Sequence, residues 1–317
     1  MSNVRPPGYR EKVTVPGALE TRPPGPARPQ QTRRAELAGF LRARRERLTP
    51  QEVGLPPGPR RRTPGLRREE LALLAGVGVT WYTWLEQGRP INASVQVLDA
   101  VARTLRLDQA GREHLYRLAE ATPVRTGTGA GTGAGTSTGA GAEPAPPPAV
   151  VDILHSLSPS PAILVNGRFD IIHSNQAHQA VFRGWHELPC IHRNLLWCGI
   201  TEASAREKFL NYDDEVPYLV ARLRSNYAAH VGDPEWEEDI RRLGELSSEF
   251  ATLWARHEVC EPEQRLRVFR DAAVGELRFT TNELSVSAVP GTFLVVYTPN
   301  DTQTRDRLAH LTAPAGT

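Results

Sequence analysis

The sequence has few cysteines and no long apolar run. Its three cysteines, Cys190, Cys198 and Cys260, are too few, and odd in number, for a disulfide framework, which agrees with a reducing compartment. No segment approaches the ~18 apolar residues of a membrane-spanning helix. The beginning of the chain also lacks the apolar stretch of a secretory signal peptide. We therefore expect a cytoplasmic protein that does not associate with a membrane.

The cysteines and histidines do not form a recognisable metal-binding pattern. Cys190, His192, Cys198 and His257 could be combined into a zinc site, but their spacing fits no zinc finger. Buried free thiols are the simpler interpretation. We expect no metal and no cofactor.

Lysine is almost absent, and the positive charge is unevenly distributed. Lys12 and Lys208 are the only lysines, so nearly all positive charge comes from arginine, whose guanidinium suits phosphate and guanine. Residues 1–125 carry a net charge of about +10 and the remainder about −8. A basic half joined to an acidic half indicates that one end of the chain meets a polyanion.

Composition divides the chain into four parts. Residues 1–30 are rich in proline and poor in apolar residues, which predicts a disordered arm. The Gly/Thr/Ala coil and proline-rich end that follow residue 125 predict a flexible tether between two independent domains. The predicted parts are the arm 1–30, a helical domain 31–121, a linker 122–149 and a second domain 150–315.

The first domain has the apolar spacing of several helices. In RRAELAGFLRARRERL, one face is apolar and the other is almost entirely arginine. In LRREELALLAG, Leu71, Leu74 and Ala75 are predicted to face the core, and Gly76 to end the helix. Ser94 and Asp108 are predicted N-caps of the two helices that follow. The pattern predicts an all-α bundle.

The second domain mixes strands and helices. Asn166-Gly167 lies between two apolar runs and predicts a hairpin. A long helical middle follows, and then Val-, Phe- and Thr-rich segments that predict two to four antiparallel strands. A last helix is predicted at about 303–312, which completes an α+β domain.

The segment LRREELALLAGVGVTWYTWLEQGR predicts a helix-turn-helix. Ala72 and Gly76 are small where the two helices must cross closely, and Val77, Tyr82 and Leu85 have the spacing of core residues. The remaining outward face belongs to the helix at about 79–87, and such a helix enters the DNA major groove. The predicted base-facing residues are Val79, Thr80, Thr83 and Trp84. The predicted phosphate contacts are Arg60, Arg61, Arg62, Arg67, Arg68 and Arg89. Glu86 is expected to face the bundle and to pair with an arginine of the first helix, with Arg44 as the choice.

These segments carry a family resemblance. LRREELALLAG with LEQGR resembles the helix-turn-helix of the Cro/C1-type (XRE) repressors. VGLPPGPRRRTPGLRREELALLAG, PAILVNGRFDIIHSN, LGELSSEFATLWARHEV and VGELRFTTNEL together resemble the MmyB-like transcription regulators, over nearly all of residues 33–312. The resemblance implies a lambda-repressor-like bundle followed by a PAS-like domain that holds a small, apolar, fatty-acid-like molecule. It also implies a bacterial, nucleoid-associated regulator that binds double-stranded DNA.

The sequence departs from that family at several positions. The family usually has serine at Gly78, an acidic residue at Thr80 and arginine at Trp84. It also tends to have Trp-Asn where this chain has Ser174-Asn175, and His-Pro where it has Asp271-Ala272. The DNA sequence read is therefore expected to be altered, and no ligand-binding residue can be assigned from the sequence.

Other functions remain open at this level. A helix-turn-helix can bind a protein instead of DNA, and paired DNA half-sites favour a homodimer without locating its interface. Trp185, Trp197, Trp236 and Trp254 could line a pocket, although ordinary packing is more common. The carboxylates at 213–215 and 235–239 and the histidines at 173, 178 and 186 form no recognisable catalytic constellation, so we do not expect an enzyme.

Overall fold

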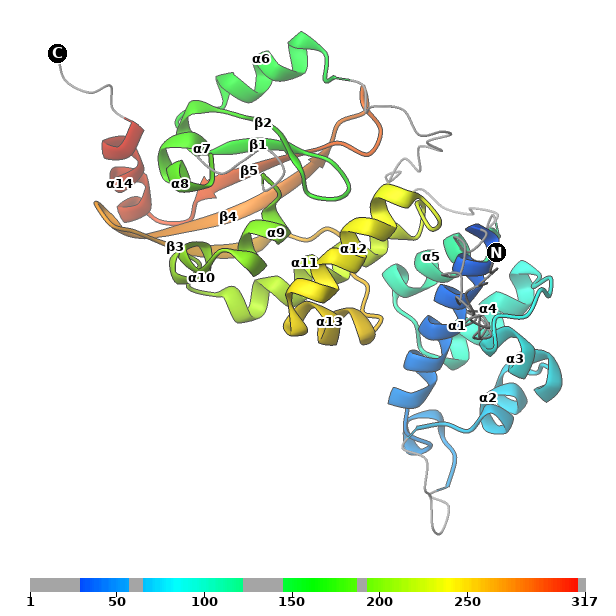
Figure 1. Cartoon of the computed structure of the whole chain (residues 1–317). Coiled ribbons are helices and arrows are strands. Elements are labelled where there is room, and N and C mark those ends of the chain that lie inside the picture. The colour runs from blue at the N-terminus through cyan, green and yellow to red at the C-terminus, as the bar shows by residue number, and fades with distance from the viewer. Residues whose placement is uncertain (1–28, 57–64, 122–144, 187–192, 313–317) are drawn as a thin grey trace, which may run out of the picture.

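The computed structural model describes residues 29–56, 65–121, 145–186 and 193–312 (Figure 1). The arm 1–30 and the linker 122–149 therefore lie almost wholly outside the described residues. In the described part of the chain, no helix is both long enough and apolar enough to cross a membrane. Two units are present, a helical bundle and an α+β domain.

The helical bundle is built as the apolar spacing predicts. Its elements are α1 (Pro29–Arg47), the short 3-10 helix η1 (Gln51–Val53), α2 (Arg68–Ala75), α3 (Val79–Glu86), α4 (Val95–Thr104) and α5 (Gln109–Leu118). Ser94 caps α4 by accepting from the Val97 N–H, and Asp108 caps α5 by accepting from the Gly111 N–H. Phe40, Leu71 and Leu98 are fully buried between these helices.

One of the three predicted core residues of α2 was predicted wrongly. Leu74 was expected in the core, but its side chain is 40% exposed, and Leu73 is 76% exposed. The predicted core residues Leu71 and Ala75 are buried, and Ala72 is buried with them, because this small residue allows close approach to the neighbouring helices.

The second unit is an α+β domain around one antiparallel sheet. The strands are β1 (Ala162–Val165), β2 (Ile171–Ser174), β3 (Arg265–Asp271), β4 (Gly275–Ser285) and β5 (Phe293–Pro299), in the order β2-β1-β5-β4-β3. The helices are α6 (Pro148–Ser156), α7 (Gln176–Val181), α8 (Arg183–His186), α9 (Leu195–Thr201), α10 (Ala203–Lys208), α11 (Tyr212–Tyr227), α12 (Pro234–Leu246), α13 (Ser248–Ala255) and α14 (Thr302–Thr312). The predicted fold class is confirmed.

Strand β1 is apolar throughout because both of its faces are covered. Leu164 packs with Leu154 of α6 and Leu294 of β5, whereas Ile163 and Val165 belong to the main core on the other face. The predicted hairpin is present, and residues 166–170 connect β1 to β2. The Asn166 side chain holds this turn by accepting from the backbone N–H groups of Arg168 and Asp170.

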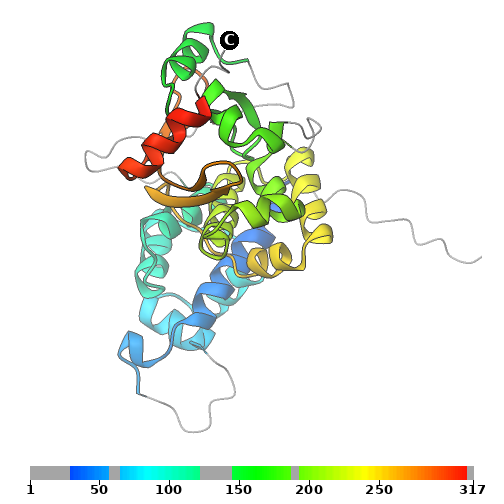
Figure 2. The same ribbon diagram turned by 90° about the vertical axis from the view of Figure 1, so that its left-hand side faces the viewer.

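The two units are in contact. Figures 1 and 2 show α11 and α13 between the sheet and α1. Arg33 of α1 donates to the Ala228 carbonyl at 2.9 Å, and Arg47 donates to the Arg256 carbonyl at 2.5 Å. Part of the arginine-rich face of α1 therefore contacts the second domain, which the expectation of two independent domains did not include.

Candidate nucleic-acid interface and sensor cavity

The turn between α2 and α3 is set by glycine. Gly76 has φ of 67°, in the left-handed region that a side chain disfavours, and the Val77 N–H reaches back to the Ala72 carbonyl at 2.9 Å. Gly78 then occupies the N-cap position of α3 in an extended conformation, without a side chain to accept a hydrogen bond. The two helices of the motif are thus joined by the short turn that the sequence predicts.

Helix α3 has one buried face and one outward face. Tyr82, Leu85 and Glu86 are buried, which fixes the helix against the bundle. The four predicted base-facing residues lie on the other side: Val79 and Trp84 are exposed by 41% and 40%, Thr80 is exposed and Thr83 is half-buried. In Figure 1, α2 and α3 lie on the side of the bundle away from the second domain, so that domain does not cover them.

A buried ion cluster anchors α3. Arg45 of α1 donates to the Glu86 carboxylate through Nε at 2.7 Å and through Nη2 at 2.8 Å, and Arg68 Nε donates at 2.9 Å. Burial alone would raise the pKa of Glu86, but Arg45 and Arg68 outweigh it and hold this pKa below its ordinary value. Glu86 is therefore ionised, and its hydrogen bonds hold α3 against α1 and α2.

The predicted arginine partner of Glu86 was wrong by one position. Glu86 does pair with the first helix, but through Arg45 and not Arg44. Arg44 points toward the second domain, where its guanidinium lies 3.4 Å from Glu258 and 5.3 Å from the Phe40 ring centroid. A single residue turns a helical side chain by about 100°, which separates the two arginines.

The predicted phosphate-binding arginines have different surroundings. Arg60, Arg61 and Arg62 lie outside the described residues. Arg67 is exposed at the start of α2, whereas Arg68 is paired with Glu86 and so has part of its charge compensated. Arg89 is exposed just after α3, and its guanidinium carbon lies 5.7 Å from the Trp84 ring centroid. The charged guanidinium of Arg89 and the apolar ring of Trp84 thus lie next to each other at the end of α3.

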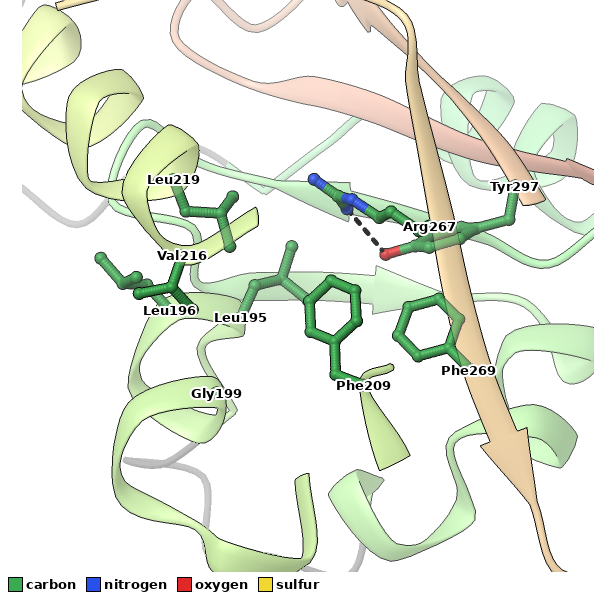
Figure 3. A pocket seen from close by; sticks show the side chains of 9 residues that line it. All are labelled: Leu195, Leu196, Gly199, Phe209, Val216, Leu219, Arg267, Phe269 and Tyr297. Atoms are coloured by element: carbon green, nitrogen blue, oxygen red, sulfur yellow. Dashed lines mark hydrogen bonds between the residues drawn. The ribbon is translucent and has the colours of Figure 1, made fainter. Parts of the chain in front are cut away.

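The α+β domain contains a small apolar cavity between the sheet and helices α9 and α11 (Figure 3). Its volume is about 10 Å³, which is room for about one water molecule. It is lined by Leu195, Leu196, Gly199, Phe209, Val216, Leu219, Arg267, Phe269 and Tyr297. A second cavity of about 20 Å³ shares Leu195, Leu219 and Arg267. A ligand of several carbon atoms can enter only if these walls move.

Buried charges border both cavities. Arg267 donates to Glu215 at 3.0 Å and to the Tyr297 hydroxyl at 3.4 Å, as Figure 3 shows for Tyr297. Burial raises the pKa of Tyr297, so this hydroxyl stays neutral. Arg222 pairs with Glu283 at 2.5 Å beside the second cavity. The first cavity therefore has mainly apolar walls, whereas the second is lined by three arginines, each paired with a carboxylate: Arg222, Arg265 and Arg267.

Several candidate residues from the sequence do not form a site. Trp197, Trp236 and Trp254 do not line either of these cavities, and nothing is described for the side chain of Trp185. Cys190 and His192 also lie outside the described residues. Among the described residues, no group of three or more His, Cys, Asp or Glu side chains could hold a metal ion. No sequence pattern indicates the lining of the first cavity, because its members come from α9, α11, β3, β5 and the loop at Phe209.

Comparison with protein families identifies the two units. A helix-turn-helix domain matches residues 36–115, and the MmyB-like transcription regulator ligand binding domain matches residues 146–311. A comparison with curated proteins finds no match. The fold and these matches define a DNA-binding transcription regulator with a ligand-binding C-terminal domain. The chain belongs to the MmyB-like transcription regulators.

Proposed function

We propose that α3 reads specific DNA sequences in the major groove. The observation that carries this proposal is the division of α3 into a buried face, anchored by Glu86, and an outward face with Val79, Thr80, Thr83 and Trp84. The threonine hydroxyls suit base edges or phosphate, and Val79 suits a thymine methyl group. Arg67 and Arg89, both exposed, are placed for phosphate contact at the two ends of the motif.

The C-terminal domain in this proposal senses a small apolar molecule. The apolar walls of the first cavity support this, together with Arg267 there and Arg222 in the second cavity, which offer polar contacts after rearrangement. A fatty-acid-like compound fits such a lining. The protein acts as a homodimer in this account, because paired half-sites raise specificity.

The test of DNA recognition is fluorescence anisotropy with the full chain and a promoter fragment next to its own gene. Wild-type affinity should fall steeply with salt, by about 0.9 in log–log slope for each phosphate contact. The variant Thr80→Ala/Thr83→Ala/Arg89→Ala should bind at least tenfold more weakly. The control Thr302→Ala/Arg305→Ala removes exposed groups of the same kinds from α14 and should bind as wild type. Unchanged affinity in the α3 variant would refute the assignment.

A further inference from the structure

A buried arginine lies at the contact between the two domains. Arg224 of α11 is 1% exposed, and its guanidinium donates to Glu36 of α1 at 2.5 Å and to the Trp254 carbonyl at 2.5 Å. It also stacks on the Trp254 ring, with its carbon 3.8 Å from the ring centroid. Removing Glu36 would leave the buried charge of Arg224 without its carboxylate partner, which destabilises the contact. We call this contact the Arg224 clamp.

Weaker contacts surround the Arg224 clamp on both sides. Arg117 of α5 donates to the Ser225 carbonyl at 3.3 Å, and Arg44 and Arg47 of α1 pair with Glu258. Gly39 allows α1 to approach closely, because a Cβ at this position would lie 2.6 Å from the His257 ring. The surface of the helical bundle that contacts the second domain, here called the docked surface, thus belongs to α1 and α5. Helices α2 and α3 are not part of it.

Helix α11, which carries Arg224, also lines both cavities of the α+β domain. We call the first of them, between the sheet and helices α9 and α11, the sensor cavity. Val216 and Leu219 of α11 line the first cavity, and Leu219 and Arg222 line the second. Arg224 follows Leu219 by five residues, or about 7.5 Å along a helix. Because the cavity has room for about one water molecule, an entering ligand must displace its walls. A helix is stiff over this length, so movement at Leu219 reaches Arg224.

We propose that α11 couples the sensor cavity to the DNA-binding domain: filling the cavity moves α11 and loosens the Arg224 clamp on α1. This regulation rests on the proposed sensing and DNA-binding function. Because the docked surface is remote from α3, the switch changes the orientation of the helix-turn-helix and does not cover it. In a dimer, that orientation sets how well two recognition helices match paired half-sites.

The clamp itself is tested first, by hydrogen exchange on the full chain without DNA. Gly39→Ala favours the helix but collides with His257, so exchange in α1 and in residues 254–259 should rise about tenfold. Gly39→Ala/His257→Gly removes the collision, and glycine suits the φ of 52° at this position. Wild-type exchange should return in the double variant. Glu36→Ala removes the carboxylate that pairs with Arg224 and should raise the same exchange. Exchange equal to wild type in both Gly39→Ala and Glu36→Ala would overturn the docked arrangement.

The cavity is tested by a pair of substitutions that need no ligand. Gly199 lines the first cavity, and a Cβ there meets nothing within 4 Å. Gly199→Ala should fit the available room and leave the interface unchanged. The leucine side chain of Gly199→Leu is larger than the cavity of about 10 Å³, so this variant should displace the cavity walls and raise exchange in α1 and residues 254–259 to the level of Gly39→Ala. If Gly199→Leu does not fold by near-ultraviolet circular dichroism, Gly199→Val is used with the same expectation. A folded overfilled variant with wild-type interface exchange would overturn the coupling.

DNA binding gives a second readout. Gly39→Ala and Gly199→Leu should change the affinity for the promoter fragment by the same factor, and the combined variant should show no further change. Independent, multiplicative effects would contradict a shared switch. If wild type fails to bind DNA, the proposed function is wrong, while the exchange measurements still decide whether the cavity controls the clamp.

Discussion

Arg45 donates two hydrogen bonds to the buried carboxylate of Glu86, and this pair joins the first helix of the bundle to the end of α3. Together with the burial of Tyr82 and Leu85, this pair fixes α3 while Thr80 and Trp84 remain exposed. An outward face reads DNA only if the helix beneath it does not move.

We predict that Glu86→Ala lowers the free energy of unfolding of the DNA-binding domain by about 3–5 kcal/mol, because it leaves Arg45 buried without its partner. Denaturant unfolding followed by circular dichroism measures this. Glu46→Gln is the control, since Glu46 also pairs with Arg45 but its side chain is 48% exposed, and it should cost less than about 1 kcal/mol. Equal losses would contradict the role of the buried pair.

The lowered pKa of Glu86 predicts a loss of stability in acid. A carboxyl whose pKa is lower in the folded state stabilises the protein fully above its unfolded value of about 4.3, and loses this contribution as the pH falls through the folded pKa. Thermal melting between pH 5 and pH 3 should therefore fall more steeply for wild type than for Glu86→Gln. Parallel curves would show that Glu86 is not held ionised.

His114 predicts a separate effect nearer neutral pH. It is 2% exposed, and neither ring nitrogen has a hydrogen-bond partner among the described residues. Burial, and then Arg224, Arg117 and Arg44, lower its pKa well below the ordinary value. The unfolded chain takes up a proton below about pH 6.5 and the folded chain does not, so stability falls as the pH drops below that value.

The substitution that tests this is His114→Leu, which has a similar size and cannot be protonated. The variant should lose less stability than wild type between pH 7 and pH 5, by up to about 1.4 kcal/mol per pH unit. Thermal melting across this range measures the difference. A wild-type curve as flat as that of His114→Leu would mean that His114 is protonated in the folded protein.

The glycines before α3 predict opposite outcomes. Gly78 has an extended backbone with room for a side chain, so Gly78→Ser should add an N-cap and stabilise the domain by about 0.5–1 kcal/mol. Gly76 has φ of 67°, and Gly76→Ala should destabilise by about 1–2 kcal/mol although its Cβ would meet nothing. Thermal melting of both variants checks this, and the same sign for both would contradict the turn geometry.

Local features of this protein could be predicted from its sequence. The end of α2 at Gly76, the caps at Ser94 and Asp108 and the hairpin after Val165 depend on residues within a few positions of each other. The two faces of α3 follow from helical spacing in the same way. In each case, the interacting groups are close in sequence, so the pattern contains the whole interaction.

Long-range contacts could not be predicted. Glu36 and Arg224 are 188 positions apart, and nothing in either segment indicates that they meet. The arginine-rich face of α1 suggested solvent or DNA, and only the docked domain shows that Arg33, Arg44 and Arg47 have partners there. The predicted pairing of Glu86 with Arg44 was wrong because helical spacing predicts which residues share a face of a helix. It does not predict which other segment of the chain packs against that face. Cavity residues were missed because they gather from segments as distant as Leu195 and Tyr297.

The most direct test of the account is the genome-wide binding profile of the tagged full chain, compared with the variant Thr80→Ala/Thr83→Ala/Arg89→Ala expressed at the same level. We predict discrete wild-type sites near promoters that share one paired sequence motif, and loss of those sites in the variant. Wild-type signal without a shared motif, or a variant that occupies the same sites equally, would contradict sequence recognition by α3.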